Sequence, residues 1–211
     1  MSLIVPVVEG PGDAEALPIL LRKILAHLNQ AHIGVATAKN AHGCGNLERT
    51  GGLERFIEYA TRTPKCGGVL VVMDTDSDAR CPLTFAASLA ARIRASGANK
   101  PVAVVLANKE YEAWLIASIE SIAGKPIKGS PGIAAGTVAP ASCESVKNPK
   151  AWLEKHFIRT QTYKETMHQA PMSAFVDPKL AKPRSRSFRR LVDALKELTH
   201  AIQTGTTVIT P

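Results

Sequence analysis

Apolar residues form short continuous runs along the first half of the chain, and amphipathic stretches separate them. Runs of this kind, rich in valine and bounded by turn residues, predict strands that are buried on both faces of a sheet. The stretches between them repeat apolar residues at helical spacing. The strands are expected at residues 3–8, 33–38, 68–73 and 101–107, and the helices at residues 13–28, 53–63, 82–95 and from about residue 109 onward.

This alternation predicts an α/β fold, a Rossmann-like and mostly parallel sheet flanked by helices on both faces. We expect this core to span residues 1–122. Residues 123–148 are rich in Gly, Pro and Ala, which predicts a loop or insertion. Residues 149–211 are expected to form a basic helical C-terminal part packed on the core, with helices at 149–156 and 187–202 and an irregular stretch between them.

Acidic residues follow two of the predicted strands. Glu9 and Asp13 come after the first strand, and Asp74, Asp76 and Asp78 come directly after the third. Because the carboxyl ends of parallel strands share one edge of a sheet, we expect these acids to lie close together. Crowded carboxylates favour a divalent cation, so Mg²⁺ or Mn²⁺ is the expected cofactor. Asp13 alone fits a second role, as the N-cap of the first helix.

A further group of charged residues follows the fourth predicted strand, and it contains Lys109, Glu110 and Glu112. The two glutamates cannot face the same way on a helix, so one is expected in the site and the other in solvent. Glu112 is the preferred site residue. Lys109 and Lys164 are candidates for contacts with a phosphate or a transition state.

Basic charge is concentrated near the end of the chain. Residues 147–190 contain eleven Lys or Arg and three Asp or Glu, an excess of eight that equals the net charge of +8 of the whole chain. Such a segment suits a polyanion, and Arg184, Arg186 and Arg189 are candidate phosphate contacts. A solvated basic surface explains the charge equally well. Aromatic residues make up only 5% of the chain, which gives little support to base-stacking surfaces.

Other familiar sites and locations do not fit. The acids from Asp74 to Asp78 cannot form an EF-hand, because Ala79 stands where that loop needs Gly and Phe85 where it needs Glu. No Gly-Lys-Ser/Thr triplet of a P-loop occurs. No apolar run approaches the ~20 residues of a membrane span, and the start of the chain does not resemble a signal peptide. A cytoplasmic location with reduced cysteines is therefore expected.

Five short motifs together resemble a known family. They are Val8-Glu9-Gly10-Pro11-Gly12-Asp13, Met73-Asp74-Thr75-Asp76-Ser77-Asp78, Glu110-Tyr111-Glu112-Ala113-Trp114-Leu115, Tyr163-Lys164 and Arg184-Ser185-Arg186-Ser187-Phe188-Arg189. The first two are similar to the Toprim domain of topoisomerases, primases and OLD-type nucleases, and all five most resemble the Toprim-like domain-of-unknown-function family 4276. The resemblance implies a general acid or base at Glu9, Mg²⁺ held by Asp74 and Asp76, and a second-metal ligand at Asp13.

The expected function is a Mg²⁺- or Mn²⁺-dependent phosphodiester hydrolase, a Toprim-type nuclease acting on nucleic acid. Its metal would be held by Glu9, Asp74 and Asp76, with help from Asp13, Asp78 and Glu112. The catalytic residues would be Glu9, Asp74, Asp76 and Lys109, while Lys164, Arg184, Arg186 and Arg189 would contact the nucleic-acid backbone.

Two alternatives remain open. One is a noncatalytic nucleic-acid-binding or ATPase-associated subunit, and the other is a phosphotransferase or phosphatase acting on a small nucleotide. The resemblance suggests an ABC-type or AAA ATPase as a partner in anti-phage defence. The sequence leaves open a homo-oligomer, and it does not distinguish DNA from RNA.

Overall fold

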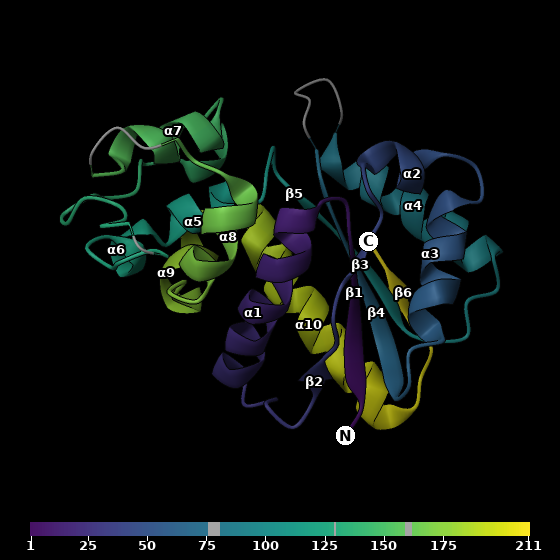
Figure 1. The fold of residues 1–211 in the computed structure, drawn as a ribbon. Coiled ribbons are helices and arrows are strands. Elements are labelled where there is room, and N and C mark those ends of the chain that lie inside the picture. The colour runs from purple at the N-terminus through teal and green to yellow at the C-terminus, as the bar shows by residue number, and fades with distance from the viewer. Residues whose placement is uncertain (76–80, 129, 159–161) are drawn as a thin grey trace.

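The fold is built on a β-sheet, and a computed structural model describes residues 1–75, 81–128, 130–158 and 162–211 (Figure 1). The strands are β1 (Leu3–Val8), β2 (Gly34–Val35), β3 (Lys39–Asn40), β4 (Cys66–Asp74), β5 (Val102–Ala107) and β6 (Ile209–Thr210). They lie in the order β2-β1-β4-β5-β6, and β3 also pairs with β1. Every pairing between these described strands is parallel. The predicted parallel α/β sheet is therefore confirmed.

Alternate residues of the central strands serve two separate cores. In β1, Ile4 and Val8 belong to one core, whereas Val5 and Val7 belong to the other. β4 repeats the pattern. Leu70 lies in the first core, and its direct neighbours Val69 and Val71 lie in the second. Because successive side chains point to opposite faces and both faces are buried, nearly every position of these strands must be apolar. That requirement explains the continuous apolar runs in the sequence.

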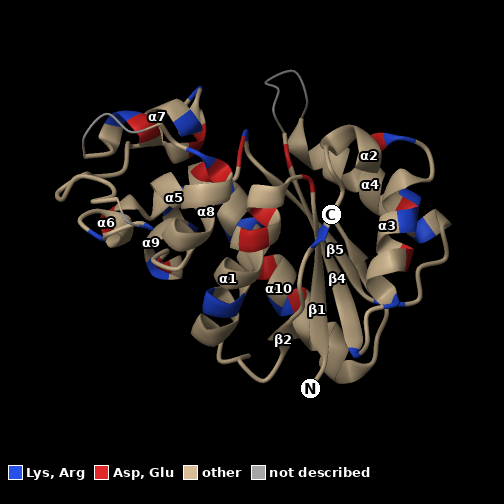
Figure 2. Cartoon of the chain, in the orientation of Figure 1, with Lys and Arg blue, Asp and Glu red and all other residues tan. Residues whose placement is uncertain are grey.

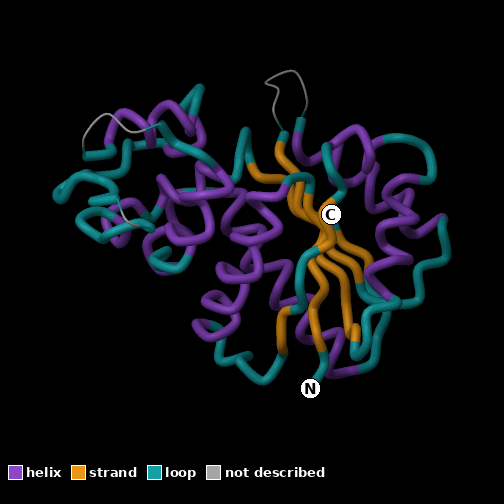
Figure 3. Tube along the Cα trace, in the orientation of Figure 1, coloured by secondary structure: helices purple, strands orange, loops and turns teal. Residues whose placement is uncertain are grey.

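Helices cover both faces of the sheet (Figures 1 and 3). One face carries α1 (Pro11–His27) and α10 (Arg186–Thr204), and the other carries α2 (Cys44–Glu48), α3 (Gly52–Thr61) and α4 (Pro82–Ala95). The buried stripe of α1 includes the leucines whose spacing predicted this helix. No helix in the described part of the chain is long and apolar enough to cross a membrane.

The remaining helices gather beyond α1, at upper left in Figure 1. They are α5 (Glu112–Ala117), α6 (Ile119–Ile122), the 3₁₀ helix η1 (Cys143–Ser145), α7 (Pro149–His156), α8 (Glu165–Ser173) and α9 (Pro178–Arg184). α8 packs along α1, and α9 packs against α10. Their buried side chains join the same core as α1 and α10. The predicted division of the chain after residues 122 and 148 stays a prediction.

Several short elements differ from the sequence prediction. α1 begins at Pro11, two residues earlier than expected, because proline fits the first turn of a helix. The strand expected at residues 33–38 is two strands, β2 and β3, which pair with different parts of β1. Residues 40–52, for which no helix was predicted, contain α2. Elements of two to five residues carry too few positions to show a period.

The irregular stretch expected after residue 156 contains two helices instead. α8 includes Pro171 and α9 includes Pro183, and a proline within an apparent helical segment argues against a helix. The helix expected from about residue 109 begins only at Glu112 and is interrupted at Ser118. The strand β6 at the end of the chain was not predicted.

Candidate functional site

The ends of β1 and β4 bring two of the predicted acids together. Glu9 directly follows β1, and Asp74 is the last residue of the neighbouring strand β4. Oε1 of Glu9 accepts a hydrogen bond of 2.9 Å from the backbone N–H of Asp74. Oδ1 of Asp74 in turn accepts one of 3.1 Å from the backbone N–H of Tyr111. Backbone donors thus hold one oxygen of each carboxylate at the carboxyl edge of the sheet.

A pocket of about 300 Å³ opens at this edge. Its wall combines the end of β4 and the segments that follow β1 and β3 with residues of α1, α5, α7 and α8. The lining residues are Glu9, Gly10, Pro11, Asp13, His42, Gly43, Asp74, Glu112, Lys150, Glu165 and Gln169. Figure 2 shows acidic positions in red at the strand ends and on the helices that face them. Five carboxylates and one lysine among the described lining residues make a site that favours a cation.

Asp13 reaches the pocket because α8 lies very close to the start of α1. Nε2 of Gln169 donates a 2.8 Å hydrogen bond to Oδ1 of Asp13. A Cβ atom on Gly12 would lie 2.5 Å from Oε1 of Gln169 and 2.8 Å from Cβ of Glu165, so this approach requires glycine. Burial raises the pKa of Asp13, and the nearby charge of Glu165 adds to that shift. The N-cap of α1 is Gly10, so the alternative role of Asp13 as N-cap is wrong.

Glu112 is the most deeply buried carboxylate among the described lining residues, with 1% of its surface exposed. It begins α5, and its Oε1 accepts a 2.8 Å hydrogen bond from the hydroxyl of Tyr163. Desolvation by burial raises the pKa of Glu112 to about 7, although Lys150 and Tyr163 oppose the shift. The Glu112 carboxyl group therefore titrates near neutral pH.

Lys150 carries the positive charge of the pocket wall. Its Nζ lies 2.5 Å from Oε1 of Glu165 and 3.5 Å from Oε1 of Glu110. Burial lowers the pKa of Lys150, but Glu165, Glu112 and Glu110 outweigh burial and raise the pKa above its usual value. Lys150 therefore stays protonated. Glu110, expected to be solvated, is a partly buried partner of this lysine, while Glu112 lines the pocket.

The two lysines singled out in the sequence lie outside the described pocket lining. Lys109 has a left-handed φ of 67°, and its backbone N–H donates a 2.8 Å hydrogen bond to Oγ1 of Thr75. That hydroxyl donates a 2.9 Å hydrogen bond to the carbonyl oxygen of Ala107. This bond connects the end of β4 to the end of β5. Lys164 is exposed at the start of α8, and its backbone N–H donates to Nδ1 of His168.

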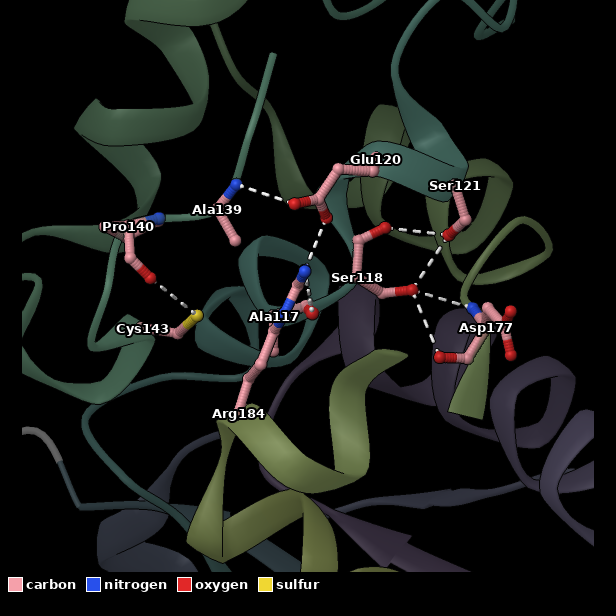
Figure 4. A network of polar contacts seen from close by, with 9 residues as sticks. All are labelled: Ala117, Ser118, Glu120, Ser121, Ala139, Pro140, Cys143, Asp177 and Arg184. Atoms are coloured by element: carbon pink, nitrogen blue, oxygen red, sulfur yellow. Dashed lines mark hydrogen bonds and ion pairs between the residues drawn. The ribbon is translucent and has the colours of Figure 1, made fainter. Parts of the chain in front are cut away.

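The predicted phosphate-binding arginines also lie outside the described pocket lining. Figure 4 shows Arg184 in a polar network, where its Nη1 lies 2.5 Å from Oε2 of Glu120 and 3.3 Å from the carbonyl oxygen of Ala117. Arg184 thus joins α9 to α5 and α6. Arg186 and Arg189 are exposed in the first turn of α10. Their predicted role in nucleic-acid binding stays a prediction.

The structure describes only some of the metal ligands expected from the sequence. Asp76 and Asp78 lie outside the described residues. Within the described residues, no group of three or more His, Cys, Asp or Glu side chains is arranged to hold a metal ion. Asp74 of the described pair precedes the other two acids by two and four residues in the sequence.

Sequence reasoning missed four polar residues of the pocket wall, namely His42, Lys150, Glu165 and Gln169. Three of them lie on α7 and α8, far along the chain from the strand ends. Lys150, Glu165 and Gln169 all belong to the basic segment of residues 147–190. No other feature of the sequence pointed to them. His42 follows β3, and recognising β3 as a strand would have placed it at the same sheet edge.

Titration of Glu112 predicts a specific pH dependence of stability. Because the pKa of Glu112 is about 7 in the folded state and 4.5 for an unperturbed glutamate, the folded state holds this proton more tightly than the unfolded chain. The stabilisation is complete below about pH 4.5, and it is lost as the pH rises through about 7. A shift of this size corresponds to about 3 kcal/mol.

Urea denaturation of the wild type and Glu112→Gln between pH 4.5 and 8 measures this effect. The glutamine keeps an acceptor for Tyr163 but does not ionise. The two free energies of unfolding should be similar at pH 4.5, and the variant should become more stable by about 3 kcal/mol near pH 8. A constant difference across this range would contradict the assigned proton.

Comparison with known proteins gives one match. The family model for Domain of unknown function (DUF4276) matches residues 8–196, and this range contains all eleven lining residues of the pocket. Searches of curated proteins and of solved structures found no match to the chain. Because the matched range covers most of the 211 residues, the chain belongs to the family Domain of unknown function (DUF4276).

Proposed function

We propose that this protein is a Mg²⁺- or Mn²⁺-dependent phosphodiester hydrolase acting on nucleic acid, with a Toprim-like site. The observation that carries the proposal is the direct contact between Glu9 and Asp74 at the carboxyl edge of a parallel sheet. In Toprim domains, which the sequence resembles, these positions hold the general acid or base and the metal-binding Asp-x-Asp pair. The surrounding pocket supplies further acids and one lysine.

The chemistry of these side chains suits a hard divalent cation. Carboxylate and amide oxygens are the ligands that Mg²⁺ and Mn²⁺ prefer. Asp74 and Asp76 would hold the ion, with Asp13 and Glu112 as further oxygen donors. The buried side-chain oxygen of Gln169, also in the wall, has no hydrogen-bond partner among the described residues. The bound cation would supply charge neutralisation at the phosphate and a lowered pKa of water.

The protein's own side chains would then carry out the proton transfers and the positioning. Glu9 takes the proton of the attacking water or returns one to the leaving oxygen, as a general base or acid. Lys150 faces the pocket as a permanently charged group and attracts the phosphate. Its ion pairs with Glu165 and Glu110 hold the ammonium group in one position. Glu112 and Tyr163 support the floor of the pocket through their hydrogen bond.

Metal-dependent cleavage by the purified chain tests the proposal. Supercoiled plasmid, circular single-stranded DNA and RNA are incubated with Mg²⁺, with Mn²⁺ or with EDTA. We expect strand cutting with one of the cations and none in EDTA. Salt-sensitive binding without cutting in any metal would overturn hydrolysis in favour of a noncatalytic binding subunit. Release of phosphate from free nucleotides without cutting would instead favour a nucleotide phosphatase.

A further inference from the structure

An exposed aromatic and basic surface lies on α3, away from the pocket. Tyr59 is 56% exposed. Arg55, Tyr59 and Arg62 follow at spacings of four and three residues, so they form one row along α3 and its C-cap. Phe56 lies beside this row and is partly buried against the core. Figure 2 shows the basic positions along α3 in blue.

Cations lie next to both aromatic rings. Nζ of Lys39, on β3, is 4.4 Å from the centroid of the Tyr59 ring, and the guanidinium carbon of Arg55 is 5.8 Å from that of Phe56. Arg62 forms an ion pair with Glu58 in which both side chains are mostly exposed, so the pair contributes little and a phosphate can replace it. We call Lys39, Arg55, Phe56, Tyr59 and Arg62 the α3 strip.

The α3 strip contains a hollow of about 290 Å³, lined by Arg55, Phe56, Glu58, Tyr59 and Arg62. Flat aromatic rings between flexible cations are the combination that binds single-stranded nucleic acid. The rings stack on bases of any sequence, and the cations contact the phosphates. Duplex bases are already stacked on one another and do not offer a free face. The strip therefore suits a single strand better than a duplex.

The α3 strip is also connected to the pocket along the edge of the sheet. Lys39 pairs with Val7 of β1, and the chain continues from β3 along the end of β1. The backbone N–H of Gly43 donates a 2.8 Å hydrogen bond to the carbonyl oxygen of Glu9. His42 and Gly43 both line the pocket. Only two residues, Asn40 and Ala41, thus separate Lys39 from His42 of the pocket wall along the chain.

We propose that the α3 strip binds single-stranded nucleic acid, with one base stacked on Tyr59 and phosphates held by Lys39, Arg55 and Arg62, and leads that strand to the pocket. The inference rests on the proposed function, because it names the substrate class of that same site. The low aromatic content of the chain gave little support to base-stacking surfaces in general. One exposed tyrosine among cations is sufficient for a single base.

Fluorescence anisotropy with the full chain in EDTA tests this inference without any strand cutting. The probes are labelled oligo-dT, oligo-U and a DNA duplex of the same length. Tyr59→Ala should weaken binding of at least one single-stranded probe about tenfold, the size of one stacked base. Tyr59→Phe should restore most of that affinity, because the ring is kept. Lys39→Gln should weaken binding and reduce its salt dependence. Lys196→Gln, at an exposed position of α10 outside the basic segment, is the matched control.

Several outcomes would overturn the inference. Unchanged single-strand affinity in Tyr59→Ala would exclude stacking, whereas an equal loss for the duplex would assign the strip to nonspecific backbone binding. Displacement of the probe by poly-glutamate at equal charge would indicate a surface for an acidic protein. Tyr59-dependent binding in a protein that cuts nothing with any metal would contradict the proposed hydrolysis and leave the binding surface standing. Metal-dependent cutting without Tyr59-dependent binding would support the proposed hydrolysis and contradict the binding role of the α3 strip.

Discussion

Asp74→Asn and Glu9→Gln should each reduce metal-dependent hydrolysis by about 10³-fold, because each removes a negative charge that the proposed cation or proton transfer requires. Both substitutions preserve shape. An amide oxygen at position 74 still accepts the hydrogen bond from the backbone N–H of Tyr111, and one at position 9 still accepts that of Asp74. The loss should therefore appear in the rate of cleavage and not in the fold.

Initial rates of oligonucleotide cleavage in Mn²⁺ and Mg²⁺ measure this effect, with circular dichroism and thermal melting as checks on the fold. Asp193→Asn, in an exposed ion pair with Lys196 on α10, is the matched control and should cut like the wild type. Wild-type rates in Asp74→Asn would contradict the proposed site. An equal loss in Asp193→Asn would show that the assay responds to charge alone.

Trp114→Ala should reduce the free energy of unfolding by about 4 kcal/mol, the largest stability effect that we expect from a single substitution. Trp114 has no exposed surface, and its ring lies 5.2 Å from that of Tyr111 and 6.1 Å from that of Phe188. Its Nε1–H donates a 2.9 Å hydrogen bond to Oγ of Ser187. Truncation leaves a cavity between α5 and α10 and removes the donor that Ser187 accepts from.

Urea denaturation followed by circular dichroism measures the change. The chain offers its other tryptophan as a control of the same residue type. Trp152 is only partly buried and stacks on His156 with ring centroids 3.9 Å apart, so Trp152→Ala should lose less than half as much stability. Similar losses for both variants would mean that α5 and α10 are not joined through Trp114.

The sheet and the acids at its edge could be predicted because their signals are local. β1, β4 and β5 are each an uninterrupted apolar run, and burial on both faces leaves few other patterns open to such residues. Given parallel strands, Glu9 and Asp74 had to meet at one edge. The preference for Glu112 over Glu110 as a site residue also rested on a local signal, the expected helix after β5.

The rest of the pocket could not be predicted, because it depends on packing between distant segments. Lys150 and Gln169 reach the wall only because α7 and α8 fold back towards α1, and Pro171 hides α8 from a helical pattern. Arg184 also has a partner that its sequence neighbourhood does not reveal. Its sequence neighbourhood is basic and predicted a phosphate contact, but the nearby carboxylate of Glu120, from another helix, forms an ion pair with it.

The wall of the pocket is shared between the beginning and the end of the chain. Glu9 and Asp74 belong to the sheet, whereas Lys150 and Gln169 come from helices near the end. Gly12 keeps these parts in contact, because any side chain there would push α8 away. Truncation at residue 148 would remove Lys150 and Gln169, and with them α10 and β6, which cover and extend the sheet. The motifs around Glu9 and Asp74 would remain in the sequence without the ammonium group that offsets their carboxylates.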